Sequence, residues 1–533
     1  MNIFISIKRL ALLASITLVL TQCSRTNLAR TGKPKIEGTG PTADVIFNLD
    51  WPNSFRNDIN WDAVWIFAKY RADGGPWRHA ALSTDPGDFS VVNDNGIPSA
   101  FETVPDGRGV FAFRASPGAG PVSWNQVSVK WHAAENDVTL EDSEVDVRVY
   151  AIEVVYVPEG RFHPGDGEVG DVRGHFRSAS ETEPFAVTGE GPIPLGGSDF
   201  TGLSTNSGYG MNPSSLDDFS DQAPTTLPQS FPKGYAPFYI MKHELTEGLY
   251  AQFLNALDDS QQYELNPANH QPQPRPGVHG YGLSTVAPFI SSVPDRPATW
   301  LTWANAAALA DWAGLRPMTE LEFEKAARGT NPPVAGEFAW GETEIADAPY
   351  SVLQINTPEE RIVDPPILLG NALYARTGGF IEGCASCRYG PLRTGAFLTL
   401  GTDRSATGGS YYGVLELSGN LWERVVTVGN AAGRRFDGSH GDGEINEHGR
   451  AAGPEVMMWP GTSNTGLESQ IIGSVGTGLR GGGWDSPAPN LRVSDREFAA
   501  TPDNRRNPRY GYRFVRTART PPAPAMPDST QSP

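Results

Sequence analysis

Between residues 43 and 157, apolar and polar residues alternate in five short segments separated by turn-forming residues. Side chains of a strand point alternately to its two faces, so a period of two predicts strands with one buried face. Clusters such as Asp73-Gly74-Gly75-Pro76 supply the turns. We therefore predict an antiparallel, immunoglobulin-like β-sandwich over residues 43–152. The segments are ADVIFNLDW (43–51), WDAVWIFAKYR (61–71), GVFAFRAS (109–116), NQVSVKWHA (125–133) and EVDVRVYAIEVVYV (144–157).

Helical periodicity appears only later in the chain, in three segments. LTEGLYAQFLNAL (245–257) begins at Thr246 with an acidic residue in its first turn. TWANAAALADWAG (302–314) ends at a glycine, and PMTELEFEKAARG (317–329) has Thr319 and Glu322 at the spacing of a capping box. Residues 163–235 are rich in Gly, Ser, Asp and Pro, and we expect loops there. With helices and strands in separate regions, the fold class is α+β.

The N-terminal segment has the pattern of an export signal. Lys8 and Arg9 precede the apolar run Leu10 to Leu20, which is too short to span a membrane and is followed by Cys23. This placement resembles a bacterial lipobox, although Gln22 replaces the usual small residue, and an ordinary signal with a chance cysteine is the alternative. Residues 1–23 are thus predicted to be a lipoprotein signal peptide lipidated at Cys23. Residues 24–42 would be a tether, and Ser24 favours the outer membrane over the inner one.

The composition narrows the class of partner. The net charge is −19, so the chain lacks the basic surface that nucleic acid requires. Gly and Pro number 59 and 45 in 533 residues, but 10% of residues are aromatic, which indicates a loop-rich globular protein. Residues 519–533 read as a disordered tail. Anchoring to a membrane would come from the lipid alone, because no later apolar run is long enough to span one.

Two further features contain residue types that bind metals or form disulfides. Cys384 and Cys387 are the other cysteines, and in an exported protein a local disulfide is the expected pairing; a redox pair or a zinc site would need surroundings that the sequence does not show. The loop 437–448, DGSHGDGEINEH, is rich in acidic residues but fits neither an EF-hand nor a helical zinc motif. We interpret it as a solvated acidic loop.

Six segments in a fixed order resemble the sulfatase-modifying-factor family, whose founding member is the formylglycine-generating enzyme. The resemblance covers residues 153–518, and it implies a fold of the C-type-lectin kind with little regular secondary structure. The segments are VYVPEGRF (155–162), PFYIMKHELTEGLYAQFL (237–254), PATWLTWANAAALADWAGLRPMTELEFEKAARG (297–329), GVLELSGNLWE (413–423), LRGGGW (479–484) and YGYRFVR (510–516).

The resemblance also implies structural calcium. In GNLWE the family offers two side-chain oxygens and two backbone carbonyls to the ion, which map to Glu416, Gly419, Leu421 and Glu423. A tight turn with Trp422 in the core is the alternative interpretation. A second calcium site of the family maps to Asn371 and Ala372, without an evident acidic partner downstream.

The family's enzymes bind copper(I) with two cysteines that follow the Gly-Gly-x-aromatic turn. Counting from Gly481-Gly482-Gly483-Trp484, those positions are Ser486 and Leu491. Copper(I) needs soft thiolates, so we expect no copper and no formylglycine-generating activity. We interpret LRGGGWDSPAPNLRVSDREFA (479–499) as a structural turn whose glycines let the backbone pass under Trp484, with Arg492, Asp495 and Arg496 as ion-paired supports.

Three functions remain open at this point. Bacterial lipoproteins of the family that lack the copper-binding cysteine pair include components of envelope machines for gliding and protein secretion. The resemblance therefore first implies a non-catalytic scaffold that contacts other envelope proteins. A recognition module for a small ligand or glycan is the second, because PDNRRNPRY (502–510) is rich in Asn, Arg and Tyr, which suit adaptable contacts. A solvated loop is the favoured interpretation of that segment. An oxidase-type or other enzyme is the third.

Overall fold

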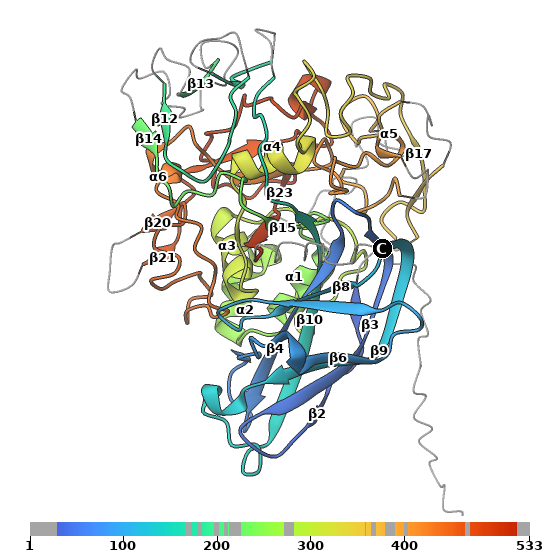
Figure 1. The fold of residues 1–533 in the computed structure, drawn as a ribbon, viewed down its shortest axis with the longest axis vertical. Coiled ribbons are helices and arrows are strands. Elements are labelled where there is room, and N and C mark those ends of the chain that lie inside the picture. Colours follow the sequence, from blue (N-terminus) through green and yellow to red (C-terminus); the bar gives the residue numbers. More distant parts are fainter. Residues whose placement is uncertain are drawn as a thin grey trace, which may run out of the picture.

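The computed structural model describes residues 29–166, 172–178, 184–196, 202–206, 212, 225–270, 282–357, 359–363, 369–378, 390–398, 403–463 and 469–519. Figure 1 shows a lower part built from long strands and an upper part built mainly from loops, short strands and helices. Cys23, Cys384 and Cys387 lie outside the described residues, and so do the lipidation and the disulfide predicted for them.

Two sheets face each other in the lower part. One is five-stranded and has the order β1-β3-β9-β6, with β2 paired to β3; the other is eight-stranded. Buried residues of both sheets form one core, in which Trp51 and Trp124 pack edge to face. The five strands predicted between residues 43 and 157 are confirmed. They are β3 (Ala43–Arg56), β4 (Asp62–Ala72), β8 (Val110–Arg114), β9 (Gly118–Trp131) and β10 (Val145–Val157).

The tether predicted for residues 24–42 is shorter than expected. β1 (Arg30–Thr31) and β2 (Lys35–Glu37) both pair antiparallel with β3. They are polar edge strands held by backbone hydrogen bonds, so no apolar alternation announced them. β6 (Phe89–Asn93) completes this sheet on the other side of β9.

The eight-stranded sheet runs through both parts of the molecule. Its order is β16-β24-β15-β10-β4-β8-β7, with β5 paired to β4. The boundary predicted between residues 152 and 153 falls inside β10, whose first residues pair with β4 and whose last four residues also pair with β15. The strands not yet bounded are β5 (Arg78–His79), β7 (Ser99–Thr103), β15 (Phe238–Met241), β16 (Arg316–Pro317) and β24 (Phe514–Thr517).

The three predicted helices form with the predicted caps. The side chain of Thr246 accepts a hydrogen bond at the start of α1 (Glu247–Leu254). Thr319 and Glu322 form the reciprocal capping box of α4 (Glu320–Arg328). α3 (Trp303–Trp312) is buried along its length, which explains its run of alanines. α2 (Asp259–Leu265) was not predicted, although Asp258 and Gln261 form its capping box.

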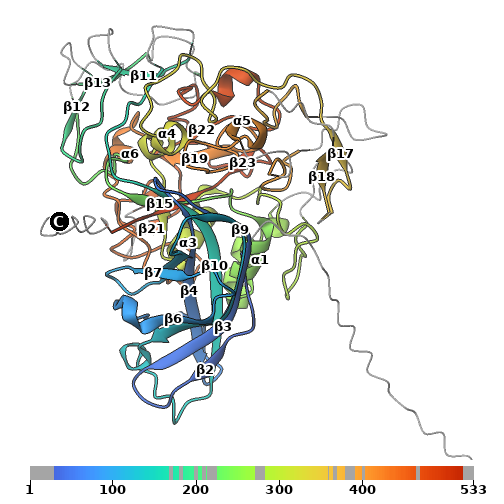
Figure 2. The same ribbon diagram turned by 45° about the vertical axis from the view of Figure 1, so that its right-hand side comes forward.

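Short elements make up the remainder. β19 (Trp422–Val426) lies between β22 (Thr477–Arg480) and β23 (Tyr510–Gly511), and Figure 2 shows α4 beside this small sheet. Part of the region predicted as loops, 163–235, forms a four-stranded sheet of three-residue strands. No helix among the described residues is long and apolar enough to cross a bilayer. The other elements are β11 (Phe176–Ser178), β12 (Ile193–Leu195), β13 (Leu203–Thr205), β14 (Thr225–Leu227), β17 (Ser351–Leu353), β18 (Arg361–Val363), β20 (Thr462–Ser463), β21 (Gln470–Ile471), α5 (Arg404–Thr407), α6 (Ala431–Arg434) and four short 3-10 turns, η1 (Pro86–Asp88), η2 (Ala133–Asn136), η4 (Pro267–Asn269) and η5 (Ala488–Leu491).

Candidate functional site

Three segments singled out in the sequence converge next to β19. The amide of Trp484 donates to Asn420 O at 2.7 Å, and the amide of Gly419 donates to Gly481 O at 2.8 Å. The third segment, 371–375, joins them because Asn420 N donates to Leu373 O at 2.9 Å. The structure therefore gathers the GNLWE turn, Asn371-Ala372 and the loop after β22 into one hydrogen-bonded unit.

This unit includes Ser486 and Leu491, the two positions predicted to correspond to the family's thiols. Ser486 is buried, and its Oγ accepts a hydrogen bond from Gly483 N at 2.9 Å. Leu491 is 0% exposed and belongs to an apolar cluster with the rings of Phe338, Trp340 and Tyr374. Ser486 therefore holds the turn together through a hydrogen bond, and Leu491 is a core residue.

The glycines of the turn do make close approaches, but not under Trp484 as expected. Gly481 and Gly482 have left-handed φ values of 81° and 70°. A Cβ on Gly481 would lie 2.6 Å from Leu417 O, and one on Gly482 would lie 2.5 Å from Leu491 Cδ1. Trp484 turns away and its Nε1 donates to Pro508 O at 3.2 Å. The glycines thus let the backbone of the turn lie close to the side chain of Leu491 and to the main chain at Leu417.

The side chains at these two positions do not fit copper(I). A thiolate is a soft ligand, whereas a hydroxyl is hard and an alkyl chain offers no lone pair. Ser486 Oγ is also engaged with the backbone of its own turn.

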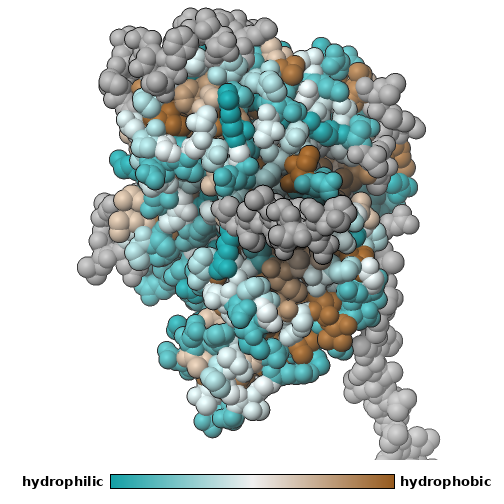
Figure 3. Space-filling view, in the orientation of Figure 1, coloured by the Kyte–Doolittle hydropathy of each residue, from teal (hydrophilic) through white to brown (hydrophobic). Residues whose placement is uncertain are grey.

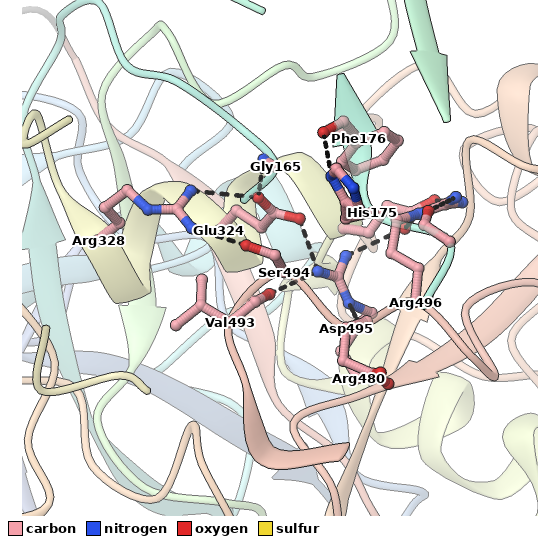
Figure 4. Close-up of polar contacts among 12 residues, drawn as sticks. Gly165, His175, Phe176, Glu324, Arg328, Arg480, Val493, Ser494, Asp495 and Arg496 are labelled. Carbon is pink, nitrogen blue, oxygen red and sulfur yellow. Dashed lines mark hydrogen bonds and ion pairs between the residues drawn. The ribbon is translucent and has the colours of Figure 1, made fainter. Parts of the chain in front are cut away.

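A frame of buried ion pairs holds the loop against α4. Arg480 Nη2 is 2.6 Å from Glu324 Oε1, and its Nη1 is 3.1 Å from Glu320 Oε2. Arg496 Nε lies 2.8 Å from the same Glu320 oxygen. Figure 4 shows Arg480 between Glu324 and the backbone of Val493 and Asp495. We call Glu320, Glu324, Arg480 and Arg496 the α4 frame, and all four side chains are fully buried.

Electrostatics differ between the frame and the loop beside it. Burial alone would raise the pKa of Glu320, but Arg496 and Arg480 hold that pKa below its usual value. Asp495 lies next to the frame, and burial raises its pKa to about 7. Its carboxylate accepts only long hydrogen bonds, from Asn490 Nδ2 and Glu497 N at 3.3 Å. The predicted support role is thus confirmed for Arg496, whereas Asp495 contributes its main-chain carbonyl to Arg480.

Three buried carboxylates meet at the GNLWE turn. Glu423 Oε1 accepts from Arg513 Nε at 2.9 Å and Nη2 at 2.8 Å. Glu416 Oε1 accepts from the amide of Gly395 at 2.6 Å. Glu244, which the sequence did not single out, accepts from Leu421 N at 2.9 Å. Burial and the charges of Glu423 and Glu416 raise the pKa of Glu244 well above its usual value.

Buried cations offset part of this charge. His243 Nδ1 lies 3.8 Å from Glu416 Oε2, and its Nε2 lies 3.8 Å from Glu153 Oε2. Burial would lower the pKa of His243, but the two carboxylates raise it. A cavity of about 140 Å³ adjoins His243, Glu244 and Glu153. Calcium at this turn stays a prediction: two of its proposed ligands are buried carboxylates, but Glu423 already has an arginine partner.

The second predicted calcium site is occupied by hydroxyl groups of the protein. Tyr350 Oη donates to Asn371 Oδ1 at 3.1 Å and reaches Ala372 O at 3.3 Å. Thr377 Oγ1 also donates to Ala372 O, at 2.7 Å. These donors satisfy the oxygens offered to an ion. Calcium at Asn371 and Ala372 stays a prediction, and these two oxygens do not need an ion to satisfy them.

Comparison with known proteins agrees with the motifs. Residues 218–518 match the family model of the sulfatase-modifying factor enzyme 1-like domain. The chain belongs to this family. Over 128 residues it is 29% identical to the formylglycine-generating enzyme of Streptomyces coelicolor, a match that covers 20% of this chain and 40% of that enzyme. Membership of the sulfatase-modifying factor family therefore rests on a domain that includes the loop, the α4 frame and the GNLWE turn.

Sequence reasoning missed His243 and Glu244 as members of the site. The signal was present: Lys242-His243-Glu244 follows the fully apolar strand β15 directly, and α1 begins soon after. Three consecutive ionisable residues between two buried elements indicate buried charge, because a chain seldom reaches solvent and returns in so few residues.

Proposed function

We propose that this chain is a non-catalytic member of the sulfatase-modifying factor family and serves as a scaffold for other proteins of the bacterial cell envelope. The observation that supports the non-catalytic part of this proposal is the environment of Leu491. An alkyl side chain enclosed by Phe338, Trp340 and Tyr374 stands where the family's enzymes need a thiolate. The α4 frame holds the same loop through Arg480 and Arg496, which is what a structural role of the loop requires.

The envelope location rests on the sequence. The apolar run before Cys23 and the lipobox-like placement of that residue support a lipid anchor at the outer membrane. The paired β-strands begin at Arg30, so only a few residues separate the anchor from the folded part. A scaffold of this design would sit close to the membrane surface.

Catalysis is tested directly by offering the purified full chain, with copper(I) and oxygen, a sulfatase peptide that contains the target cysteine. We expect no conversion of cysteine to formylglycine by mass spectrometry, while the Streptomyces coelicolor enzyme converts the same peptide in parallel. Conversion by this chain above the level of a buffer control would refute the non-catalytic assignment.

The anchor and the scaffold are tested together in the native bacterium. Cys23→Ala should move the protein out of the membrane fraction, because the variant lacks the lipid that we propose as its membrane attachment. Cross-linking followed by purification from wild-type membranes should recover other envelope proteins, and the same procedure on the Cys23→Ala strain should recover fewer. Membrane association that persists without Cys23 would contradict the lipoprotein assignment.

Ligand recognition through residues 502–510 is the alternative function. The side chains of Arg505 and Arg509 are 82% and 52% exposed, which is what an adaptable contact surface requires. Their neighbours fix the backbone, since Tyr510 Oη donates to Asp503 Oδ2 at 2.7 Å. On the face shown in Figure 3, hydrophilic and hydrophobic residues are interspersed. Glycan binding that is lost in Arg505→Ala and Arg509→Ala would favour recognition over the scaffold.

A further inference from the structure

Three acidic side chains from separate segments meet at the end of α3. Asp311 lies in the last turn of the helix, Asp442 in the acidic loop 437–448, and Glu455 in the turn that follows the loop. One carboxylate oxygen of each lies within 4.8 Å of the other two. This is the one such group of three metal-ligating side chains among the described residues. The acidic loop, predicted to be solvated, is therefore folded back onto a buried helix.

The carboxylate of Asp311 is incompletely satisfied. Asp311 is 0% exposed, and its Oδ1 accepts from Asp442 N at 3.1 Å. Its Oδ2 is buried and has no hydrogen-bond partner of normal geometry, and the same holds for Glu455 Oε1. An unpaired buried carboxylate oxygen is costly, so each of these atoms calls for a cation or a donor.

The three carboxylates also disfavour one another's charge. Burial, together with Asp442 and Glu455, raises the pKa of Asp311 well above its usual value, against the smaller opposing effect of two backbone amides. Burial also raises the pKa of Glu455. The C-terminal end of a helix adds negative potential at this place. A bound cation would remove the repulsion that these groups feel without one.

The backbone is built to bring the loop this close. Gly443 N donates to Asp311 O at 3.0 Å. A Cβ on Gly441 would lie 2.3 Å from the Cα of Asp311, so only glycine allows the approach. The cluster is thus a fixed feature of the packing between α3 and the loop.

Lys69 of β4 is a buried cation whose charge interacts with those of Asp311 and Asp442. Its Nζ donates to the carbonyl of Gly443. Burial lowers the pKa of Lys69 to about 7. Arg108 acts on Glu455 only from a distance. These two cations leave Asp311 Oδ2 and Glu455 Oε1 without direct partners.

We propose that Asp311, Asp442 and Glu455 bind a hard divalent cation, calcium by preference. Calcium takes oxygen ligands at about 2.4 Å, so two of its ligand oxygens lie at most about 4.8 Å apart. The three oxygens of the cluster lie within that limit of one another. Asp442 and Glu455 are half-buried, which leaves room for water ligands to complete the shell. Zinc would prefer nitrogen or sulfur ligands, and the cluster offers none.

Terbium luminescence on the full chain tests the site, because terbium replaces calcium and Trp312 next to Asp311 can sensitise it. We expect saturable terbium emission, displaced by calcium. Asp311→Asn should weaken terbium binding about tenfold or more, because one of three charged ligands is lost. Glu455→Gln should do the same, and it keeps the proposal testable if Asp311→Asn folds poorly. Glu447→Gln, an exposed carboxylate of the same loop, is the matched control and should bind as the wild type does.

Two outcomes would overturn the proposal. Emission that survives both Asp311→Asn and Glu455→Gln but disappears in Glu416→Gln would place the ion at the GNLWE turn, next to Trp422. Absence of saturable emission in the wild type would mean that the three carboxylates bind no metal ion and are accommodated by protonation together with the charge of Lys69. In the supported case, calcium should also raise the melting temperature of the wild type and of Glu447→Gln, but not that of Glu455→Gln.

Discussion

The loop after β22 consists of two halves with opposite chemistry. In residues 481–491 the buried side chains of Ser486 and Leu491 make neutral contacts: Ser486 Oγ accepts from Gly483 N, and Leu491 is packed among aromatic rings. The ion pair of Asp485 with Arg509 lies at the surface. In residues 492–496 the chain is fastened to α4 through charges, with Arg496 on Glu320. The first half contains the two positions predicted to correspond to the thiols of the family's enzymes, and the second half joins the loop to α4.

This difference follows from what each substitution costs. A residue in an apolar cluster can be exchanged for another apolar residue of similar size at a small cost in stability. A member of a buried charge network cannot be removed alone, because its partner is then left charged and desolvated. We therefore expect apolar substitutions at Leu491 to be tolerated better than the removal of a charged member of the frame.

The largest effect is expected from removing one member of the α4 frame. Arg480→Met should lower the free energy of unfolding by about 3 kcal/mol or more, because Glu320 and Glu324 both lose a buried partner. Chemical denaturation measures this change. Arg505→Met removes a solvent-exposed arginine paired with Asp503 and should have little effect. Similar stability of the two variants would contradict the distinction between frame and surface.

A smaller effect is expected in the first half of the loop. The loss of stability should differ between substitutions at Leu491 and at Ser486. Leu491→Ala should lower the free energy of unfolding by about 2 to 3 kcal/mol, because it opens a cavity among rings that cannot collapse fully. Ser486→Ala removes one hydrogen bond to Gly483 and should cost about 1 kcal/mol. Both are read from denaturation midpoints. A larger loss in Ser486→Ala than in Leu491→Ala would mean that the hydroxyl, and not the packing, holds this half.

Much of the fold could be predicted from local patterns. The strands β3, β4, β8, β9 and β10 follow from alternation, and the caps of α1 and α4 from Thr246 and Thr319, because these signals lie within a few residues. The edge strands β1 and β2 are only two and three residues long, too short for alternation to reveal them, although Ile36 of β2 packs against the core. The sharing of one sheet by β10 and β15 could not be predicted, because it depends on residues far apart in sequence.

From the sequence, the site could be predicted only for residues that lie in or next to a family motif. The order of LRGGGW and GNLWE placed Ser486, Leu491 and Glu423 in one region, and the structure brings those segments together. Partners were not predictable: Arg480 meets Glu320 across 160 residues, and Asp311 meets Asp442 across 131 residues. A charged residue in a sequence does not disclose whether it is buried, so the acidic loop was interpreted as solvated.

The last prediction concerns Asp495, which lies at the join between the two halves. Its pKa is about 7 in the folded chain, against about 3.9 for an aspartate in an unfolded chain. Between these values the folded state binds more protons than the unfolded state, so the contribution of Asp495 to stability decreases as pH rises through this window and levels off above it. The slope from one such group is at most about 1.4 kcal/mol per pH unit.

Asp495→Asn removes this titration, because an amide stays neutral. The variant should gain stability relative to the wild type as pH rises from 5 to about 7.5, measured as the difference between two denaturation series. Asp485→Asn is the matched control, since that carboxylate pairs with the partly exposed Arg509 on the surface and should give no such trend. If the profiles of Asp495→Asn and the wild type ran parallel, Asp495 would be charged in the folded state. The charged region would then extend from the frame into the join between the two halves.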